Sequence, residues 1–384
     1  MRKYDFIIAG GGMAGLSLAY YLTQSPLRDR SILILDRDVK DRNDRTWCFW
    51  EKEAGAFESI IFRQWNQVNF HGTTHAGALN LGDYRYKMLR GIDFYEFVQT
   101  ELQKWPNIEF RQASINRIKE TPQGGFVIAD DEPYIADFVF DSTFSLKLNQ
   151  PENHNLLQHF RGWVIKTTTP CFSPNLPEIM DFRVDQGGDC RFVYVMPFDE
   201  TTGLVEFTLF NEQLLTEADY EIALRQYISQ HLGAVSYDIC EIETGVIPMS
   251  DEPTQENPSE HIIRIGTAGG YTKPSTGYTF QRTQRYLKAL VTNLVETGKP
   301  TRKQSWFTKR FKLYDSIFLN VLENKRHPAD DMFTRFYAEN RPAKAFQFLD
   351  EDTRLVDEIR LFMTMPLLPF TTAFFNVIRR KMFG

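Results

Sequence analysis

A glycine-rich turn between an apolar strand and a helix restricts the fold of this chain more than any other feature. Residues 4–9 read YDFIIA, and Gly10, Gly12 and Gly15 follow with the spacing GxGxxG before a helical segment at residues 15–24. Gly10 permits a tight turn, Gly12 lets the backbone approach a diphosphate, and Gly15 allows close packing of helix on strand. The free N–H groups and the dipole of the helix N-terminus then favour a negatively charged ligand.

The next segment supplies the rest of a dinucleotide-binding unit. Residues 31–35 (SILIL) are typical of a second buried strand, so the chain begins with a strand–helix–strand unit and a parallel sheet. Asp36 ends this strand, at the spacing expected of an acid that hydrogen-bonds ribose hydroxyls. Met13 and Ala14 lie inside the glycine turn. We therefore predict an α/β fold with a Rossmann-type domain that binds a dinucleotide.

A second glycine-rich turn favours FAD over NAD as this dinucleotide. Residues 261–265 resemble another buried strand, and Gly266 and Gly269 follow, ahead of a long helix predicted for residues 279–297. The simplest reason for two such turns is that both contact one long, extended cofactor. The pattern indicates a flavoprotein of the glutathione-reductase-like type.

The rest of the chain extends this domain in two ways. The predicted FAD-binding domain is discontinuous and comprises residues 1–150 and 261–300. Residues 151–260 are rich in strand patterns and are predicted to form a β-sheet that contacts the substrate. Residues 301–384 are predicted to be mainly helical.

Basic and apolar residues concentrate in this helical region. The net charge of the protein is −6, which gives no reason to expect nucleic acid as a partner. After residue 300, however, 15 Lys and Arg residues stand against 10 Asp and Glu residues. Residues 361–378 carry no charge, and Arg379, Arg380 and Lys381 follow. Two prolines oppose a regular membrane span, so this segment either lies in a membrane interface or packs on the core as a helix pair.

The cysteines indicate a reducing compartment. The four of them are far apart and form no CxxC pair, which favours free thiols and no zinc site: Cys48, Cys171, Cys190 and Cys240. The start of the chain lacks the apolar stretch of a signal peptide. We therefore expect no metal, and a cytoplasmic protein that associates peripherally with the inner face of the cell membrane.

A carboxylate interrupts an apolar strand in the middle of the chain. Residues 204–210 read LVEFTLF, with Glu206 among Leu204, Phe207, Leu209 and Phe210. A buried, unpaired carboxylate costs several kcal/mol unless its pKa rises and it stays neutral. Glu206 therefore lies either on a wet face of the sheet or in a dry site that uses a protonated acid.

Several motifs together resemble the FAD-dependent lycopene cyclase family, in particular the bacterial lycopene β-cyclases. They are RTWCFW at 45–50, FVYVMPF at 192–198, LVEFT at 204–208, ETGVIPM at 243–249 and PSTGY at 274–278. The resemblance covers roughly residues 4–340 and rests on the whole set in this order. Wider relatives of the same fold are geranylgeranyl reductases and flavin-dependent monooxygenases.

The resemblance implies an isomerase that converts the ψ end groups of lycopene to β rings, giving γ-carotene and β-carotene. Reduced FAD would stabilise the carbocation, and NAD(P)H would only keep the flavin reduced. Glu206 maps onto the acid that starts cyclisation, with Thr208 on the same strand face. Many members carry a second acid directly after the first, but Phe207 stands there in this chain, which puts a two-carboxylate site at this strand in doubt. Glu243 either assists the proton path or is an ordinary strand-end acid.

The resemblance also implies contacts around the flavin. Arg45, Gly266, Gly269, Thr276 and Gly277 map onto expected cofactor-binding positions, while Thr267 replaces the acid that many flavoproteins carry near the ribityl chain. Five aromatic residues are either cation–π partners of the carbocation or ordinary core: Trp47, Phe49, Trp50, Tyr194 and Tyr278.

Two other functions fit the same motifs. A redox flavoenzyme of this fold, such as an isoprenoid reductase or a monooxygenase, would consume NAD(P)H in proportion to product. A flavin-bearing carotenoid-binding protein without catalysis would not need Glu206 at all.

Overall fold

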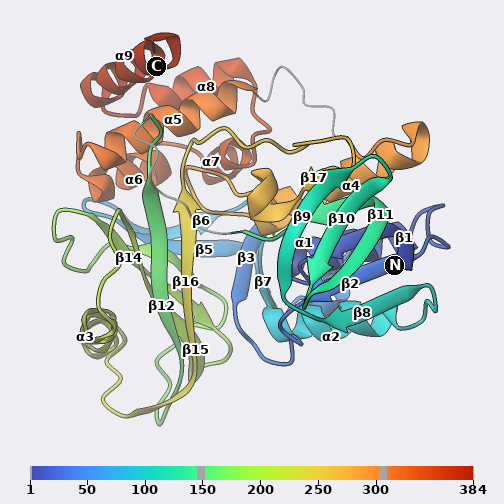
Figure 1. Ribbon diagram of the computed structural model, residues 1–384. Coiled ribbons are helices and arrows are strands. Elements are labelled where there is room, and N and C mark those ends of the chain that lie inside the picture. The colour runs from blue at the N-terminus through green and yellow to red at the C-terminus, as the bar shows by residue number, and fades with distance from the viewer. Residues whose placement is uncertain (1, 145–151, 302–308, 384) are drawn as a thin grey trace.

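The computed structural model describes residues 2–144, 152–301 and 309–383. Its main parts are two seven-stranded sheets and a group of C-terminal helices. The first sheet carries both chain segments predicted to bind the dinucleotide. The second sheet stands beside it, and the C-terminal helices lie over one end of that second sheet (Figure 1). The expected domain boundary at residue 150 falls outside the described residues.

The first sheet is built around the strand–helix–strand unit predicted from the sequence. Its strand order is β8-β2-β1-β11-β10-β9, and β17 pairs with β11. The strands β1, β2, β8, β11 and β17 are parallel where they pair, whereas β9 and β10 form an antiparallel hairpin arrangement with β11. The bounds are β1 Arg2–Ala9, β2 Ile32–Asp36, β8 Ile108–Gln112, β9 Ile115–Thr121, β10 Gly124–Ala129, β11 Glu132–Asp141 and β17 Ile262–Arg264.

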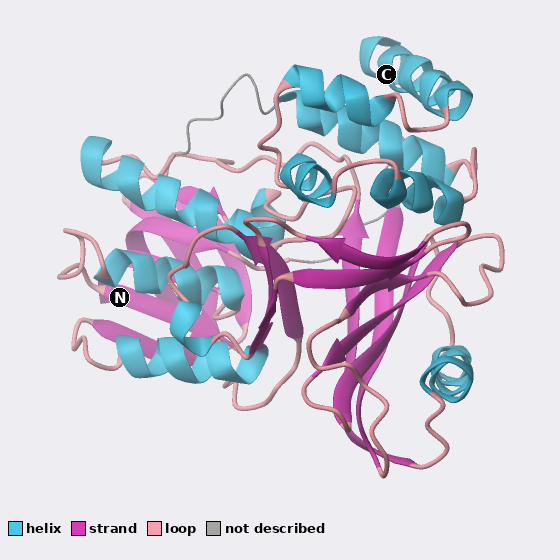
Figure 2. Ribbon diagram, turned by 180° about the vertical axis from the view of Figure 1, so that it is seen from behind, coloured by secondary structure: helices cyan, strands magenta, loops and turns pink. Residues whose placement is uncertain are grey.

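Three helices cover one face of this sheet: α1 Met13–Thr23, α2 Gly91–Leu102 and α4 Phe280–Thr297. Figure 2 shows them side by side in front of the strands. Gln284 of α4 accepts a hydrogen bond from the Tyr21 hydroxyl at 3.0 Å and donates one to Ser17 at 3.1 Å, both on α1. These contacts join the two chain segments that carry the glycine turns.

The second sheet is antiparallel in its main part and has the order β16-β12-β15-β14-β13-β5-β6. Its strands are β5 Gln67–His71, β6 Ala76–Asn80, β12 Leu156–Thr167, β13 Glu178–Asp181, β14 Cys190–Pro197, β15 Thr202–Asn211 and β16 Tyr237–Met249. Helix α3, Glu217–Tyr227, covers one face, and a core that includes Trp163 and Leu224 fills the space between. The other face of the sheet is turned toward the interior of the molecule.

The strands β5 and β6 differ from the division predicted from the sequence. Residues 1–150 were expected to belong to the FAD-binding domain, yet β5 pairs in parallel with β13 and completes the second sheet. Alternation of apolar and polar residues predicts a strand but does not say which sheet it joins. A small sheet of β3 Thr46–Glu51, β7 Arg85–Arg90 and β4 Arg63–Trp65 lies between the two larger ones.

The C-terminal region is helical, as predicted. Its helices are α5 Lys309–Glu323, α6 Ala329–Ala338, α7 Pro342–Leu349, α8 Leu355–Phe362 and α9 Leu367–Phe383. Ala373 and Val377 of α9 are buried, so this helix packs on the others, while much of its opposite face is exposed. Within the described part of the chain, we find no helix with both the length and the apolar character needed to cross a membrane.

Candidate functional site

The first glycine turn has the backbone geometry that its sequence predicts. Gly10 has φ of 103°, a left-handed conformation that glycine adopts without steric cost. A Cβ atom on Gly15 would lie 2.0 Å from the carbonyl oxygen of Gly10, so only glycine fits there. Around Gly12 a Cβ atom would meet nothing within 4 Å, and α1 begins without a side-chain cap. The first turn of α1 thus offers backbone N–H groups to a ligand.

The second glycine turn lies directly against the first. Gly266 has φ of 61°, and a Cβ atom on it would lie 2.8 Å from the Cβ atom of Ala14. Beyond this turn, the Thr272 hydroxyl donates to Thr279 at 3.1 Å and lies 3.2 Å from the Thr267 hydroxyl. Two segments more than 250 residues apart in the sequence therefore form one wall.

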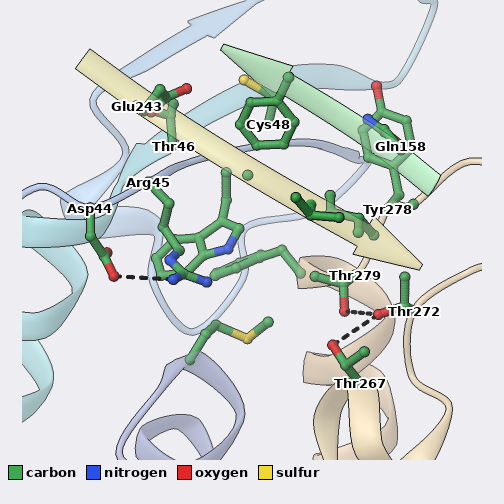
Figure 3. A pocket seen from close by; sticks show the side chains of 18 of the residues that line it. Asp44, Arg45, Thr46, Cys48, Gln158, Glu243, Thr267, Thr272, Tyr278 and Thr279 are labelled. Carbon is green, nitrogen blue, oxygen red and sulfur yellow. Dashed lines mark hydrogen bonds and ion pairs between the residues drawn. The ribbon is translucent and has the colours of Figure 1, made fainter. Parts of the chain in front are cut away.

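A cavity of about 580 Å³ extends from these turns to the second sheet. Figure 3 shows Glu243 and Thr46 on one side of it and the hydroxyls of Thr267, Thr272 and Thr279 on another. Seven of the predicted cofactor-binding residues line it: Gly12, Met13, Ala14, Arg45, Gly266, Thr276 and Gly277. Glu206 and Glu243 line the same cavity. We call it the first cavity.

Four predicted cofactor-binding residues lie outside this lining. Gly10, Gly15 and Gly269 shape the turns through their backbone. Asp36 stands at the end of β2, where its Oδ2 accepts a hydrogen bond of 2.6 Å from the Gly11 N–H. Its carboxylate is thereby held beside the glycine turn.

Glu206 and Glu243 face each other across one glycine. Gly162 of β12 pairs with Glu206 of β15 on one side and with Glu243 of β16 on the other. A Cβ atom on Gly162 would lie 3.0 Å from Cγ of Glu243 and 3.3 Å from Cβ of Glu206. The missing side chain leaves the space in which the two carboxyl groups meet and hydrogen-bond to each other.

Each carboxyl group of this pair also has a threonine partner. The Thr208 hydroxyl donates to Oε1 of Glu206 at 3.0 Å, and the Thr46 hydroxyl donates to Oε2 of Glu243 at 2.9 Å. Burial, and then the neighbouring Glu243 carboxyl, raise the pKa of Glu206 well above its usual range. Burial also raises the pKa of Glu243. The pair therefore retains a proton at pH values where an exposed glutamate has lost it.

Charged and neutral groups both lie near the pair: the Glu241 carboxylate raises the pKa of Glu243 and the Arg45 guanidinium lowers it, while four neighbouring hydroxyl and thiol groups are neutral. Burial raises the pKa of Tyr278 to about 12 and that of Tyr194 well above its usual range, and their hydroxyl oxygens lie 3.5 Å apart. Burial also raises the pKa of Tyr86 and of the Cys48 thiol. None of these four groups is a charged base near neutral pH.

One expectation about the surroundings of Glu206 is wrong, and for two aromatic residues the structure decides between the alternatives that the sequence left open. Phe207 and Leu209 point to the opposite face of β15, into the core beneath α3, because successive side chains of a strand alternate. Phe49 and Trp50 do not line the first cavity: Phe49 stacks on Phe280 with ring centroids 4.5 Å apart, and Trp50 packs edge-on against Tyr278. Of the five aromatic candidates, Trp47, Tyr194 and Tyr278 line the cavity.

Two histidines have local partners. His159 lies 2.6 Å from the Tyr220 hydroxyl, and burial lowers its pKa to about 4. His261 contacts the carbonyl oxygen of Asp137 at 2.8 Å. Both are structural contacts away from the first cavity.

Sequence reasoning missed several residues of the site, above all Gly162 and Gln158. Gln158 of β12 is buried and lines the cavity, and its Oε1 has no hydrogen-bond partner among the described residues. Gly277 has φ of 72°, and a Cβ atom there would lie 2.2 Å from this oxygen. The available signals in the sequence were Gln158 and Gly162, a polar residue and a glycine within the apolar strand β12. Thr46, Cys48 and Tyr86 were missed because their partners come from other strands.

These residues fit an extended dinucleotide. An uncapped helix N-terminus behind three glycines suits a diphosphate, and Asp36 stands where a ribose acceptor is expected. Gly12, with open space around it, and Gln158 both line the first cavity between α1 and the glutamate pair. The Gln158 Oε1 atom has no hydrogen-bond partner among the described residues.

The glutamate pair is expected to lower the stability of the fold. An acid whose pKa is higher in the folded than in the unfolded state destabilises the folded state above its unfolded pKa of about 4.3. Glu206→Gln should therefore raise the melting temperature near neutral pH, and the gain should shrink as the pH falls toward that value. Thermal unfolding over a pH series measures both. Glu212→Gln, at an exposed position beyond β15, is the control and should change neither. A lower melting temperature for Glu206→Gln at neutral pH would contradict the assignment.

Comparison with known proteins gives the family. The sequence model of the family described as "Lycopene cyclase protein" matches residues 5–374. The lycopene β-cyclase of Pseudescherichia vulneris is 22% identical over 392 residues, covering 96% of each chain. The lycopene β-cyclase of Pantoea ananas is 24% identical, over 72% of this chain and 71% of that one. A neoxanthin synthase of Solanum lycopersicum is 24% identical over 78% of this chain, which spans only 62% of that protein's length.

Solved structures show the same fold at low identity. A geranylgeranyl bacteriochlorophyll reductase-like protein from Thermoplasma acidophilum matches with a TM-score of 0.62 and 13% identity, over 97% of this chain and 96% of that one. A flavoprotein/dehydrogenase from Cytophaga hutchinsonii matches with a TM-score of 0.64 and 13% identity, over 97% and 98%. The predicted fold, that of FAD-dependent oxidoreductases with a β-sheet second part, is confirmed. The family match spans both glycine turns, the Glu206–Glu243 pair and most of the helical region, and the chain belongs to the lycopene cyclase family.

Proposed function

We propose that this protein is a lycopene β-cyclase, which isomerises the ψ end groups of lycopene to β rings by acid-initiated cyclisation. The observation that carries this proposal is the Glu206–Glu243 pair, because a protonated carboxyl group in a dry site is the group that protonation of an alkene requires. The proposal assigns FAD to the first cavity, on the basis of the glycine turns and the family.

The proposed reaction needs one proton in and one proton out. Glu206 donates its proton to C2 of the end group, the C5=C6 bond attacks C1, and a C1–C6 bond forms. The resulting carbocation loses a proton from C6, which leaves the β ring. After donation, both carboxyl groups carry a negative charge. Their mutual repulsion makes the pair a strong base, which accepts the proton that C6 loses. The composition of the substrate does not change, so no electron is consumed.

The remaining groups position and protect the intermediate. Thr208 and Thr46 each donate a hydrogen bond to one carboxyl group of the pair, which holds both groups in position. The faces of Trp47, Tyr194 and Tyr278 stabilise positive charge by roughly 1 kcal/mol or more each. FAD, held by the residues of the glycine turns, would in its reduced form supply negative charge to this site, and NAD(P)H would serve as its reductant.

Isotope incorporation tests this proposal. The flavin-loaded protein is incubated without oxygen with lycopene in liposomes, excess NADPH and deuterated water, and products and NADPH consumption are measured. Cyclic product with one deuterium per ring, and far less than one NADPH per ring, is the expected result. Hydrogenated or oxygenated product with matching NADPH consumption would instead identify a redox enzyme of the same fold.

We also propose that α8 and α9 dock on a membrane with anionic headgroups. Exposed apolar side chains gather there, among them Met363 at 73% and Leu368 at 79% exposure. Exposed basic residues lie in the same region: Arg354, Arg360, Arg379 and Lys381. Arg380 does not contribute, because it binds Asp251 at 2.6 Å. The combination of an apolar helix face with flanking basic residues is typical of interfacial helices.

Point substitutions test this docking better than deletion, because removing residues from about 355 onward would also uncover the buried Ala373 and Val377 contacts. The triple variant Ile359→Ser, Met363→Ser and Leu368→Ser is expected to bind vesicles of phosphatidylcholine and phosphatidylglycerol at least about tenfold more weakly, from the apolar area lost. A matched control replaces three exposed apolar residues of the β-rich part, Leu214, Ile222 and Val235, by serine. Equal vesicle binding by the two triple variants would refute docking through this surface.

A further inference from the structure

A second cavity, of about 560 Å³, lies beneath the C-terminal helices and has no role in the site described so far. Strands of the second sheet form its floor, and α5, α6, α7, α8 and α9 form its walls and roof. More than half of the residues that line it are aromatic. In Figure 1 this region lies where the orange and red helices meet the end of the second sheet.

The inner end of the second cavity adjoins the first. Tyr86, Tyr194, Thr276 and Tyr278 line both cavities, so these side chains are the partition between them. The Tyr194 and Tyr278 hydroxyl oxygens, 3.5 Å apart, form part of that partition. Glu206 lies on the far side of it, next to Tyr194 along the β14–β15 pairing. A long molecule with one end at Glu206 can therefore extend past these side chains into the second cavity.

The outer end of the second cavity reaches the apolar surface of α9. Leu367, Phe370, Thr371, Phe374 and Phe375 line the cavity, and Phe375 remains 64% exposed. The docking surface proposed above begins at the same helix, so the cavity opens where a bilayer would lie. An apolar chain leaving the bilayer there would meet mainly apolar side chains along its path.

The charged residues in the wall of the second cavity are paired. Lys273 binds Asp315 at 2.8 Å and Glu351 at 3.1 Å, and Arg282 binds the same Glu351 at 2.9 Å, so two cations face two anions. Ser275 also donates to Asp315 at 2.6 Å. These contacts also tie the loop that carries Thr276 and Tyr278 to α5. Since the charges neutralise each other, the cavity suits a hydrocarbon rather than a polar or ionic ligand.

We propose that the second cavity binds the polyene chain of a linear isoprenoid hydrocarbon, which enters from the membrane at α9 and passes the tyrosine partition with its end group first. This inference rests on the proposed cyclase function, since it assigns the rest of the substrate whose end group lies at Glu206. The partition then keeps the polyene away from water while the end group reaches the glutamate pair.

Pigment binding without turnover tests this assignment. The flavin-loaded Glu206→Gln protein is mixed with all-trans lycopene in detergent, and the lycopene that co-elutes with protein is measured by absorbance. Adding Leu313→Trp, which fills the cavity from α5, or Thr371→Trp, which fills its outer end, should reduce the retained lycopene at least about tenfold.

Thr372 provides the matched control. It is the same residue type on the same helix, and its hydroxyl donates to the carbonyl of Leu368 as that of Thr371 does to Leu367, but it does not line the cavity. Thr372→Trp should retain lycopene as Glu206→Gln does. Flavin absorbance and melting temperature verify folding, and if Leu313→Trp does not fold, the pair of threonine variants decides.

Two results would overturn the assignment: no retained lycopene in the Glu206→Gln protein, or equal retention by Thr371→Trp and Thr372→Trp. The outcome is distinct from that of the isotope experiment. If Thr371→Trp reduces lycopene retention but the wild type forms no rings, the cyclase proposal is refuted and the proposed binding site stands. If the wild type forms rings but Thr371→Trp and Thr372→Trp retain lycopene equally, the binding site is refuted and the cyclase proposal stands.

Discussion

Glu206→Gln is expected to reduce the rate of ring formation by roughly 10²- to 10⁴-fold, the range that a positioned general acid contributes. Glutamine keeps the size of the side chain and its hydrogen bonds to Thr208 and Glu243, but it cannot donate a proton to carbon. The rate is measured with reduced flavin, in the absence of oxygen, by chromatography of the carotenoids. Flavin content should equal that of the wild type, because glutamine keeps the size of the side chain that lines the first cavity.

Glu212→Gln is the control for this substitution, because it makes the same chemical change at an exposed position just beyond the same strand. It should leave the rate unchanged. If Glu206→Gln retained the wild-type rate, Glu206 would not be the acid, and a carotenoid-binding protein without catalysis at this pair would become the better description.

Glu243→Gln is expected to shift the alkaline limb of the pH–rate profile to lower pH. The reaction needs Glu206 protonated, so the rate falls as the pH rises through the pKa of Glu206. The Glu243 carboxyl contributes to the raised pKa of Glu206, after burial itself, and glutamine removes its negative charge. The pKa of Glu206 is then lower, and the acid is lost at a lower pH. Initial rates from about pH 5 to about pH 9 measure the shift.

The direction of this shift separates the two interpretations of Glu243. Glu243 lies in the middle of β16 rather than at its end, and if its role were only structural, its replacement would leave the profile in place, as Glu212→Gln should. A shift to higher pH would mean that Glu243 lowers the pKa of Glu206, which is the opposite of the proposed pairing. The rate on the acid side should also fall, because one of the two carboxylates that take back the proton is gone.

The glutamate pair brings together two acids that lie far apart in the sequence. The sequence pattern LVEFT places Phe207 directly after Glu206, and the pleat of a strand sends that position into the core under α3. The second acid comes instead from β16, two strands away in the sheet and 37 positions later in the chain. No local pattern around Glu206 contains that information, because the two strands meet only through β12.

The sequence by itself determined the features that depend on local backbone geometry. Gly10 and Gly15 occupy positions where a Cβ atom is strained or excluded, so their spacing fixes the turn, the helix behind it and the parallel sheet. The strand pattern around Glu206 likewise identified an acid within an otherwise apolar strand, although it left open whether that acid faces a wet surface or a dry site. The helical character of the C-terminal region followed from its composition for the same reason.

Only the tertiary structure decided which residues meet. Gly162 separates Glu206 from Glu243, and the Tyr86–Tyr194–Tyr278 partition adjoins both cavities, through contacts between strands that are distant in the sequence. The strands β5 and β6 joined the second sheet because a matching edge was available there, not because their own residues specify it. Side-chain spacing predicts the face on which a residue lies, whereas the partner across that face is set by the packing of the whole chain.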